Sequence, residues 1–417
     1  MIGLGLGIKI IGGSASAAPV LLSAPFGYNY TVPFNVYRST AGVYSHSFSM
    51  DAVKPTATVT LYCGPGGDNS KDGLSWANRV RSLKQLIVRI QAQSGSAVVR
   101  CLVQVGTYKS SSVDGGGIQD SFYGSYIERD VIFEPCDANG NVLTGGTTAS
   151  RRVISLHDQT MPAWALVSGS VYASTYTTEV PAPGCFDLSK INSKGCPQAL
   201  HYAPPASSYA NEAAIVAGVA AMAAAYGHGA CWIDATNKKY YVQTFDGRAP
   251  DANIVVTRGG INTNGANARN LYLIGRYGGT QTVWARDLHL WGGAPLYAAA
   301  QFSGEGRIVA ATFADSSFSY SCINGYNADG AGIHTLLRCA ADDNYKDGYN
   351  YDQASGFDAS GTAVMRFHEM DCTADWNGNS SQSEDSDNAS SCHVRTKGVR
   401  INVVANRTLN RAFHDIA

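Results

Sequence analysis

The sequence predicts an all-β protein, and a right-handed parallel β-helix is the architecture that fits it best. Charged residues make up only 15% of the 417 residues and glycines number 45, a composition that suits short strands joined by turns. Short apolar runs recur from Ile254 onward with turn residues between them, as in a solenoid whose coils each hold three short strands. A β-sandwich or a propeller with equally short strands is the alternative.

The charge balance excludes some classes of function. A net charge of −1 provides no basic field for nucleic acid phosphates or anionic lipid, so neither is an expected partner. No stretch reaches the ~20 apolar residues of a membrane span. Acidic residues nevertheless gather between Asp342 and Asp387, where Lys346 and Arg366 are the only cations. This acidic region departs most from the rest of the chain.

Two regions are predicted along the chain. Residues 1–55 form a Gly- and Ala-rich leader and a small β module, in which alternating apolar residues from Tyr28 to Val36 indicate a strand. The segment 1–18 is interpreted as a docking peptide or a signal peptide. Residues 56–417 form the predicted β-helix, with long insertions at about 110–230 that include an Ala-rich helix between Asn211 and Tyr226.

The β-helix is expected to begin with a strand from Thr58 to Cys63 and a helix from about Trp76 to Ala92, with Ser75 as its N-cap. The next strand is AVVRCLVQVGTY. We expect the helix to cover the open end of the coil, because an uncovered coil end is an unpaired sheet edge.

Turn signals separate the later strands. Asn324-Gly325, Asp347-Gly348 and Asn377-Gly378 mark turns at intervals of 23 and 30 residues. Ten cysteines without a CxxC pair are predicted to be mostly small buried side chains. Cys185 and Cys196, in a Pro/Gly-rich loop, are a candidate disulfide.

Two segments carry a resemblance to a known group of proteins. The segments are GPGGDNSKDGLSWANRVRSLKQL and WIDATNKKYYVQTFDGRAPDANIVV. They resemble, respectively, the entry motif before the cap helix and a Tyr-rich strand leading into Asp-Gly-Arg-x-Pro in right-handed parallel β-helix proteins of the bacteriophage tailspike and tail-fibre type, within the pectate-lyase-like superfamily. The resemblance implies a virion or extracellular protein, a homotrimer, a host surface polysaccharide as ligand, and tail or baseplate proteins bound through the leader. It carries over no active-site residue.

The acidic region supplies the predicted catalytic residues. Strand alternation in HEMDC places Glu369 and Asp371 on one face and Met370 and Cys372 on the other, so both carboxylates are expected to point outward. Such carboxylates lie about 7 Å apart, a separation that suits the acid and base of an inverting glycoside hydrolase. Asp347 is expected to join them from a neighbouring coil, where like charges raise pKa values.

Aromatic and acidic residues nearby form the predicted substrate-binding set, since aromatic faces suit stacking on sugar rings. The set is Tyr345, Tyr349, Tyr351, Trp376, Asp343 and Asp375. Two other interpretations of the acidic region stay open: a solvated surface, and a Ca²⁺ site that lacks the EF-hand spacing. No other cofactor is expected.

Three functions therefore stay open. The first is a tailspike or tail-fibre protein that binds host polysaccharide, with or without hydrolysing it as a depolymerase. The second is a non-catalytic virion structural or adhesion protein. The third is a secreted polysaccharide lyase, which is disfavoured because only Lys346 and Arg366 offer a base in the acidic region.

Overall fold

The computed structural model describes residues 20–22, 32–177, 181–192, 195–202, 209–259, 269–275, 279–299, 308–352, 365–378, 387–393, 396–408 and 411–415. The chain forms two compact units, residues 1–49 and residues 50–417. In the first unit, β1 (Val20–Leu21), β2 (Val36–Arg38) and β3 (Tyr44–His46) form an antiparallel sheet in that order. The segment 1–18, Tyr28 and Tyr30, which carry predictions, lie outside the described residues.

The second unit opens with a 3-10 turn, η1 (Asp51–Val53), the strand β4 (Val59–Cys63) and the helix α1 (Leu83–Gln91). Ser82 caps the helix, because its Oγ accepts a hydrogen bond from the backbone N–H of Gln85 at 3.1 Å. The predicted helix start near Trp76 is wrong. The backbone of Val80 is still bound to the β4 segment, with its N–H donating to the carbonyl of Tyr62.

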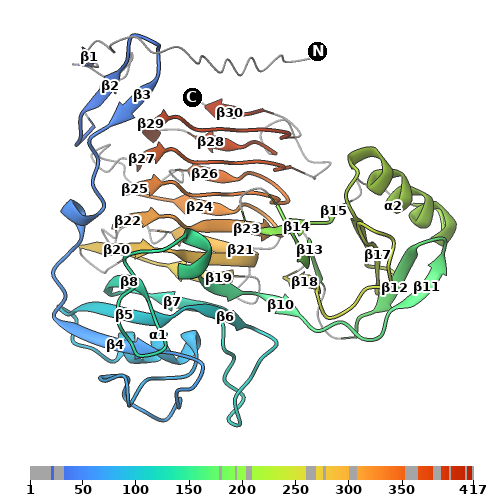
Figure 1. The fold of residues 1–417 in the computed structure, drawn as a ribbon, viewed down its shortest axis with the longest axis horizontal. Helices are drawn as coiled ribbons and strands as arrows, with labels where there is room; N and C mark the ends of the chain where they lie inside the picture. Colours follow the sequence, from blue (N-terminus) through green and yellow to red (C-terminus); the bar gives the residue numbers. More distant parts are fainter. Residues whose placement is uncertain are drawn as a thin grey trace. The chain divides into compact units, whose positions relative to one another are not determined.

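The apolar face of α1 is buried in the same core as the strand interiors. Its core residues are Leu83, Leu86, Ile87 and Ile90. The helix packs against β4 and β7 (Ser125–Ile127), where the stack of strands begins (Figure 1). It covers that end of the apolar core, as the sequence predicts.

Eight parallel strands form the first ladder of the second unit (Figure 1). In spatial order they are β4, β5 (Val98–Gln104), β8 (Asp130–Cys136), β20 (Thr280–Arg286), β22 (Ile308–Ala314), β25 (Gly332–Leu337), β27 (Met365–Met370) and β29 (Thr396–Ile401). Every neighbouring pair is parallel.

Two further parallel ladders share the long strand β21 (Leu288–Ala299). The second ladder contains β6 (Gly106–Lys109), β9 (Val153–Leu156), β21 and β23 (Ser317–Ser321), and it continues as single bridges from Ser317 to Ala340, Thr373 and Val404. The third contains β7, β19 (Arg269–Leu273), β21, β24 (Tyr326–Asp329), β26 (Tyr349–Asp352), β28 (Ser390–Cys392) and β30 (Phe413–Asp415).

From β22 onward the chain visits the first, second and third ladders in a constant order. Side chains at equivalent corners of neighbouring turns are 23, 33 and 31 residues apart. Two of the predicted turn signals stack on each other, because the amide of Asn324 accepts from the backbone N–H of Asp347. Asn377 belongs to a different stack, in which its amide oxygen accepts from Asn344 at 3.0 Å.

The described structure is thus mostly β with parallel sheets, as predicted. The parallel pairing of the ladders disfavours the β-sandwich and propeller alternatives, whose sheets are antiparallel. The interior is apolar and contains large aromatic side chains, among them Phe133, Phe313 and Phe318.

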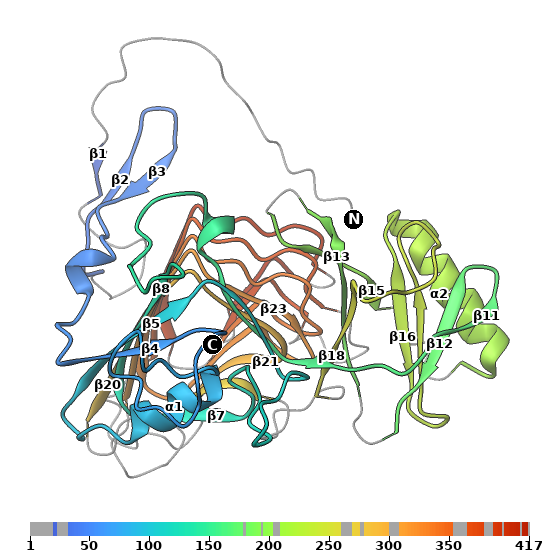
Figure 2. The same ribbon diagram turned by 60° about the horizontal axis from the view of Figure 1, so that its bottom comes forward.

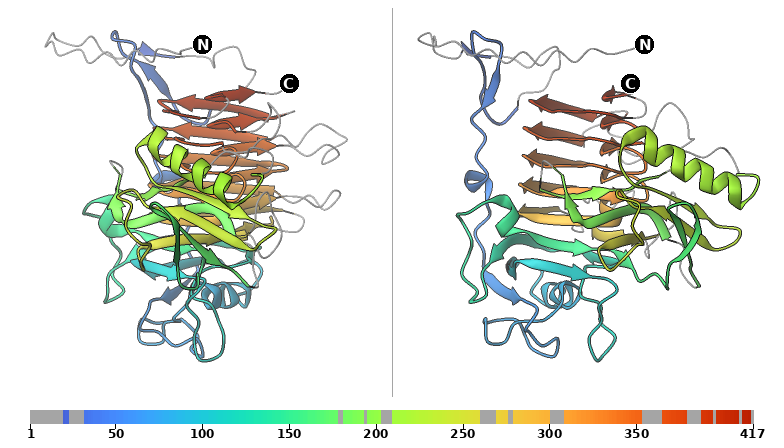
Figure 3. Two further views of the ribbon diagram at one scale, coloured as in Figure 1. Left: turned by 90° about the vertical axis from the view of Figure 1, so that its right-hand side faces the viewer. Right: turned by 45° about the vertical axis from the view of Figure 1, so that its right-hand side comes forward.

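A separate module is inserted between β9 and β19 (Figures 2 and 3). Its first sheet is antiparallel, in the order β10 (Asp158–Gln159), β18 (Ile254–Arg258), β13 (Pro181–Ile191) and β14 (Pro197–Ala199). Its second sheet runs β11 (Ala165–Ser168), β12 (Val171–Thr175), β17 (Lys239–Gln243), β16 (Ala230–Asp234) and β15 (His201–Tyr202). A short turn, η2 (Thr148–Arg151), precedes β9.

The predicted Ala-rich helix is present as α2 (Glu212–Tyr226). Asn211 caps it by accepting from the N–H of Ala214 at 3.0 Å, and Gly227 ends it with a φ of +63°. Ile215 and Val219 are buried against the second sheet of the module. Figure 3 shows the helix beside that sheet.

All ten cysteines are free thiols, and eight are buried, as expected of small apolar side chains. The candidate disulfide between Cys185 and Cys196 is wrong, since both are free. Among the described residues, no helix combines the length and apolarity that crossing a membrane requires.

Candidate functional site

The chain turns between ladders through residues with a left-handed backbone. One set of these residues, which we name the second corner column, lies at the end of the second ladder. It consists of Tyr320, Asp343, Trp376 and Arg407, with φ values of +61°, +58°, +59° and +54°. Backbone hydrogen bonds join its levels, from Asp343 to the carbonyl of Asp375 and from Trp376 to the carbonyl of Asn406. This conformation costs a non-glycine residue roughly 1 kcal/mol or more.

The second corner column opens into a cleft of about 370 Å³. One wall comes from the ladder corners and the other from the module. The cleft residues are Asn192, Gln198, His228, Phe245, Asp342, Asp343, Asp375, Trp376 and Arg407. A hollow that combines carboxylates, amides, a guanidinium and aromatic rings has the mixture of groups that a polar ligand with apolar faces requires.

The carboxylates on the ladder side are held by backbone groups. Asp342 is 5% exposed, and its Oδ1 accepts from the N–H of Asp375 at 2.8 Å. Asp375 in turn accepts from the backbone N–H and the side-chain amide of Asn406, at 2.9 and 3.1 Å. These bonds fix the position of both side chains before any ligand arrives.

Trp376 joins the two walls of the cleft. Its ring centroid lies 4.3 Å from that of His201, 5.3 Å from that of Tyr226 and 5.7 Å from that of His228, all in the module. The Arg407 guanidinium lies 4.5 Å from the same centroid. Much of the indole surface is therefore used to dock the module, which leaves less of it for a sugar ring than predicted.

Phe245 is an aromatic cleft residue that the sequence analysis missed. It is 48% exposed, and the Lys190 ammonium lies 5.6 Å from its ring centroid. Phe245 follows β17 in the TFDGR segment, whose Asp-Gly turn was the available signal. An exposed ring in a polar cleft offers an apolar face to a ligand.

A smaller inner cavity of about 30 Å³ adjoins the cleft, and Asp343 and Trp376 line both. The predicted residue Tyr345 lines it, together with His201 and Tyr202. Tyr202 is 3% exposed, and its ring stacks on that of Trp232 with centroids 5.0 Å apart.

The histidines beside the cleft are neutral near neutral pH. Burial, with help from the nearby His228 and Arg407, lowers the pKa of His201 to about 3. Burial and Arg407 also lower the pKa of His228. Both imidazoles therefore add no positive charge to the cleft at pH 7.

The predicted site residues divide into two groups. Asp343, Asp375 and Trp376 line the cleft, and Tyr345 lines the inner cavity. The other predicted residues line neither hollow.

The prediction that Glu369 and Asp371 share an outward face is wrong. Glu369 is fully buried, where Ser390 Oγ donates to its carboxylate at 2.7 Å and Arg400 lies 3.6 Å from it. Asp371 is exposed, but its φ of +54° ends the strand alternation on which the prediction depended. The two carboxylates therefore do not share the outward face on which their prediction as a catalytic pair depended.

Asp347, Tyr349 and Tyr351 are also internal. Asp347 is 3% exposed and accepts from the backbone N–H of Asn388 at 2.8 Å, so it continues a stack of amide side chains. Both tyrosines are fully buried, and Tyr351 stacks on Phe367 with centroids 4.3 Å apart. Neither ring is accessible to a sugar.

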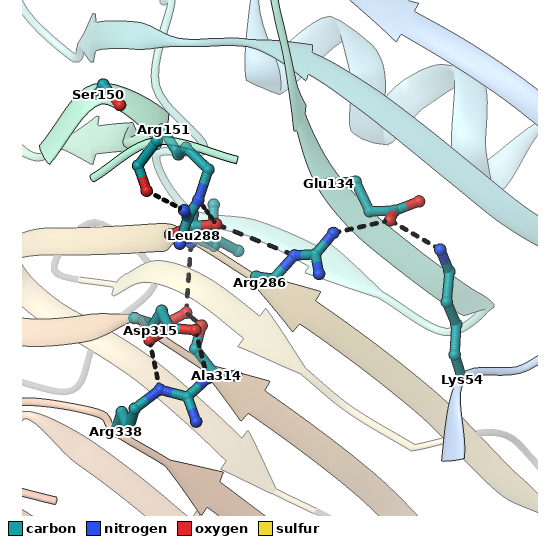
Figure 4. Close-up of polar contacts among 12 residues, drawn as sticks. Lys54, Glu134, Ser150, Arg151, Arg286, Leu288, Ala314, Asp315 and Arg338 are labelled. Carbon is teal, nitrogen blue, oxygen red and sulfur yellow. Dashed lines mark hydrogen bonds and ion pairs between the residues drawn. The ribbon is translucent and has the colours of Figure 1, made fainter. Parts of the chain in front are cut away.

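A first corner column follows the first ladder and shares the left-handed backbone. It consists of Asp287, Asp315, Arg338, Asp371 and Asn402, with φ values from +50° to +56°. Its side chains are occupied locally: Arg338 binds Asp315 through two bonds of 2.7 Å, and Asn402 donates to Asp371 at 2.8 Å. Figure 4 shows the Arg338 pair, and it also shows Glu134 between Lys54, which follows η1, and Arg286 on the neighbouring strand β20.

Among the described residues, no group of three or more His, Cys, Asp or Glu side chains is arranged to hold a metal ion. The described residues therefore provide no set of ligands that supports the Ca²⁺ interpretation of the acidic region.

Comparisons with known proteins give little further information. No family model matches the chain, and no curated protein matches it. A solved structure described as a glycoside hydrolase is similar over 86% of this chain and 97% of its own, with 8% identity and a TM-score of 0.33.

Proposed function

We propose that the second unit is a right-handed parallel β-helix that binds a polysaccharide in the cleft. The β-helix proposal is supported by the constant order in which the chain visits the three ladders and by the parallel pairing of their strands. Capping of the first coils by α1 fits the same architecture.

One observation carries the binding proposal. Trp376 and Arg407 adopt the left-handed backbone conformation, which is unfavourable for residues with bulky side chains. Their side chains line the cleft together with Asp343. Strain of this kind clusters at functional sites, where the side chain matters more than its cost.

The chemistry of the cleft suits sugars. Carboxylates accept strong charge-assisted hydrogen bonds from hydroxyl groups, and the amides of Asn192 and Gln198 can both donate and accept. The exposed ring of Phe245 offers an apolar surface to a sugar ring face. A polysaccharide presents both kinds of group along its length.

Hydrolysis of the bound glycan is the catalytic form of this proposal. Asp343 and Asp375 replace Glu369 and Asp371 as the candidate acid and base, because they line the cleft from neighbouring turns of the chain. A purely adhesive role is favoured by the backbone hydrogen bonds of Asp342 and Asp375, which occupy part of their accepting capacity.

The experiment measures both binding and release of reducing ends on a panel of bacterial surface polysaccharides, for wild type, Asp343→Asn, Asp375→Asn and Asp371→Asn. Asp371→Asn is the matched control, since it changes an aspartate with the same backbone conformation outside the cleft. Cleavage lost only in the cleft variants supports a hydrolase. Binding without cleavage supports an adhesin, and products that absorb as unsaturated uronates would indicate a lyase. No binding on the panel contradicts the proposal.

We further propose a biological setting in which the chain is a tailspike or tail-fibre protein of a virion. In it, residues 1–18 dock to tail or baseplate proteins, the chain is a homotrimer, and the ligand is a host surface polysaccharide. Deleting residues 1–18 should abolish incorporation into particles while leaving the second unit folded, and light scattering should give the mass of three chains. A monomer, or a deletion variant that still assembles, would contradict this setting.

A further inference from the structure

Phe245 reaches the cleft from a short turn that follows β17 and runs from Thr244 to Arg248. The backbone N–H of Gly247 donates to the carbonyl of Thr244 at 3.1 Å, and Gly247 has a φ of +72°. Thr244 Oγ1, on a side chain that is buried, donates to the carbonyl of Arg248 at 2.7 Å. The two ends of the turn are therefore bonded to each other.

Arg248 ties this turn to the neighbouring strand β13. Its Nη2 donates to Asp187 Oδ2 at 2.8 Å and to Ser189 Oγ at 3.1 Å, while its Nη1 donates to Asp246 Oδ1 at 2.9 Å. Asp187 is only 1% exposed, so the guanidinium is anchored to a carboxylate that is itself fixed in the module. Hydrogen bonds between two charged groups are among the strongest in proteins.

The same end of β13 also contacts the ring of Phe245. The Lys190 ammonium lies 5.6 Å from the ring centroid and 3.4 Å from Asp246 Oδ2. On another side, the ring of His228 lies nearly perpendicular to the phenyl ring, with centroids 6.4 Å apart. Phe245 is therefore oriented by its neighbours, although nearly half of its surface is exposed.

An aromatic ring contributes most to sugar binding when it is fixed before the sugar arrives. On a loose turn the ring would lose conformational freedom on binding, and that loss subtracts from the affinity. A loose ring would also be free to turn onto the protein surface, because burial of apolar area is favourable. The described lining of the cleft includes Phe245 and not Arg248, so the effect of Arg248 on a bound glycan runs through the ring.

We propose, on the premise that the cleft binds a polysaccharide, that Arg248 is a positioning residue that holds Phe245 as a sugar-stacking platform. A guanidinium suits this role, because its planar fork donates to Asp187 and Asp246 at the same time. Removal of Arg248 leaves the phenyl ring present but no longer fixed.

A double-mutant cycle tests this role. Calorimetric titration of the bacterial surface polysaccharide that wild type binds most tightly is carried out with Arg248→Met, Phe245→Ala and the double variant. Each single variant should bind about 10-fold more weakly. The double variant should bind no more weakly than Phe245→Ala, because no ring is left to position. Losses that multiply in the double variant, or wild-type affinity in Arg248→Met, would overturn the proposal.

Lys239→Met is the matched control. Lys239 lies at the opposite end of β17, where it pairs with Glu212 at 2.8 Å outside the described cleft lining, so this variant should keep wild-type affinity. If urea unfolding shows that Arg248→Met does not fold, Thr244→Val takes its place in the cycle with the same expected result. It removes the hydroxyl that closes the turn and keeps the ion pairs of Arg248.

The positioning role and the proposed function fail in different ways. Wild-type affinity in Phe245→Ala, together with a loss in Asp343→Asn, would overturn the positioning role and leave the glycan-binding cleft standing. Binding of no polysaccharide by wild type would overturn the proposed function, and the positioning role with it.

Discussion

The two corner columns share one backbone conformation but differ in what their side chains contact. In the first column, Arg338 and Asp315 bind each other, and Asn402 binds Asp371. Asp and Asn tolerate the left-handed conformation well, so most of this column is explained by local structure. Arg338 and Asp315, and likewise Asn402 and Asp371, thus find partners within their own column.

The second corner column places Trp376 and Arg407 in the same conformation, which suits neither residue. Their side chains reach away from the ladder to the module and the cleft. Ladder hydrogen bonds therefore set the backbone conformation of both corner columns. The side chains of the second column are explained only by their contacts with the module and the cleft.

The largest expected effect comes from removing Trp376, the side chain that distinguishes the second column. Trp376→Ala deletes the contacts with His201, Tyr226 and Arg407, and should lower the free energy of unfolding by about 2–3 kcal/mol while abolishing glycan binding. Urea unfolding and calorimetry measure the two effects. Trp376→Phe should recover most of the stability, and a stable Ala variant that binds normally would break the comparison.

Acid should destabilise the folded state through buried histidines. Burial lowers the pKa of His201, His289 and His334 to about 3 and that of His368 to about 4. Only the unfolded chain takes up these protons below about pH 6.5, so their contribution to stability is full above that pH and is lost as pH falls. Each costs on the order of 2 kcal/mol between pH 6.5 and pH 5.

Urea unfolding at pH 7 and pH 5 measures this loss. His201→Phe, beside the second column, should reduce the difference in the free energy of unfolding between pH 7 and pH 5 by the contribution of one histidine. An unchanged difference in that variant would show that His201 is already protonated in the folded protein near pH 5.

Charge removal in the cleft should have a smaller, selective effect. Asp343→Asn should weaken binding of a neutral glycan about 10-fold, as expected for loss of one charge-assisted acceptor, without changing the urea midpoint by much. Asp371→Asn in the first column should leave the affinity unchanged. Equal losses in both variants would remove the functional distinction between the columns.

The smallest effect is expected in the first column itself. Asp315→Ala breaks the bidentate pair with Arg338, whose side chain is 52% exposed, so the stability loss should stay below about 1 kcal/mol. Glycan binding should not change. A large loss of affinity would mean that the columns are coupled through the ladder.

Sequence reasoning identified those features of this protein that depend on local pattern. Short apolar runs that recur between turn residues led to the parallel sheets, and the Ala-rich composition led to α2. Acids beside aromatics led to Asp343, Asp375 and Trp376, which line the cleft and whose function stays a prediction. The prediction from the two-residue alternation of strand side chains was wrong at Asp371, because a left-handed corner residue ends the alternation there.

Residues outside the reach of local pattern were missed or misplaced. Tyr349 and Tyr351 look like surface aromatics, but they fill the core between the ladders. Phe245 and His201 come from an insertion more than one hundred residues away from Trp376, so only the folded structure brings Phe245 to the cleft and His201 to the inner cavity.

The central claim is that the second corner column binds glycan and the first does not. The most direct measurement is calorimetric titration of the tightest-binding polysaccharide of the panel into wild type, Asp343→Asn and Asp371→Asn under identical conditions. The account predicts weaker binding for Asp343→Asn alone. Wild-type affinity in Asp343→Asn, or an equal loss in Asp371→Asn, would contradict it.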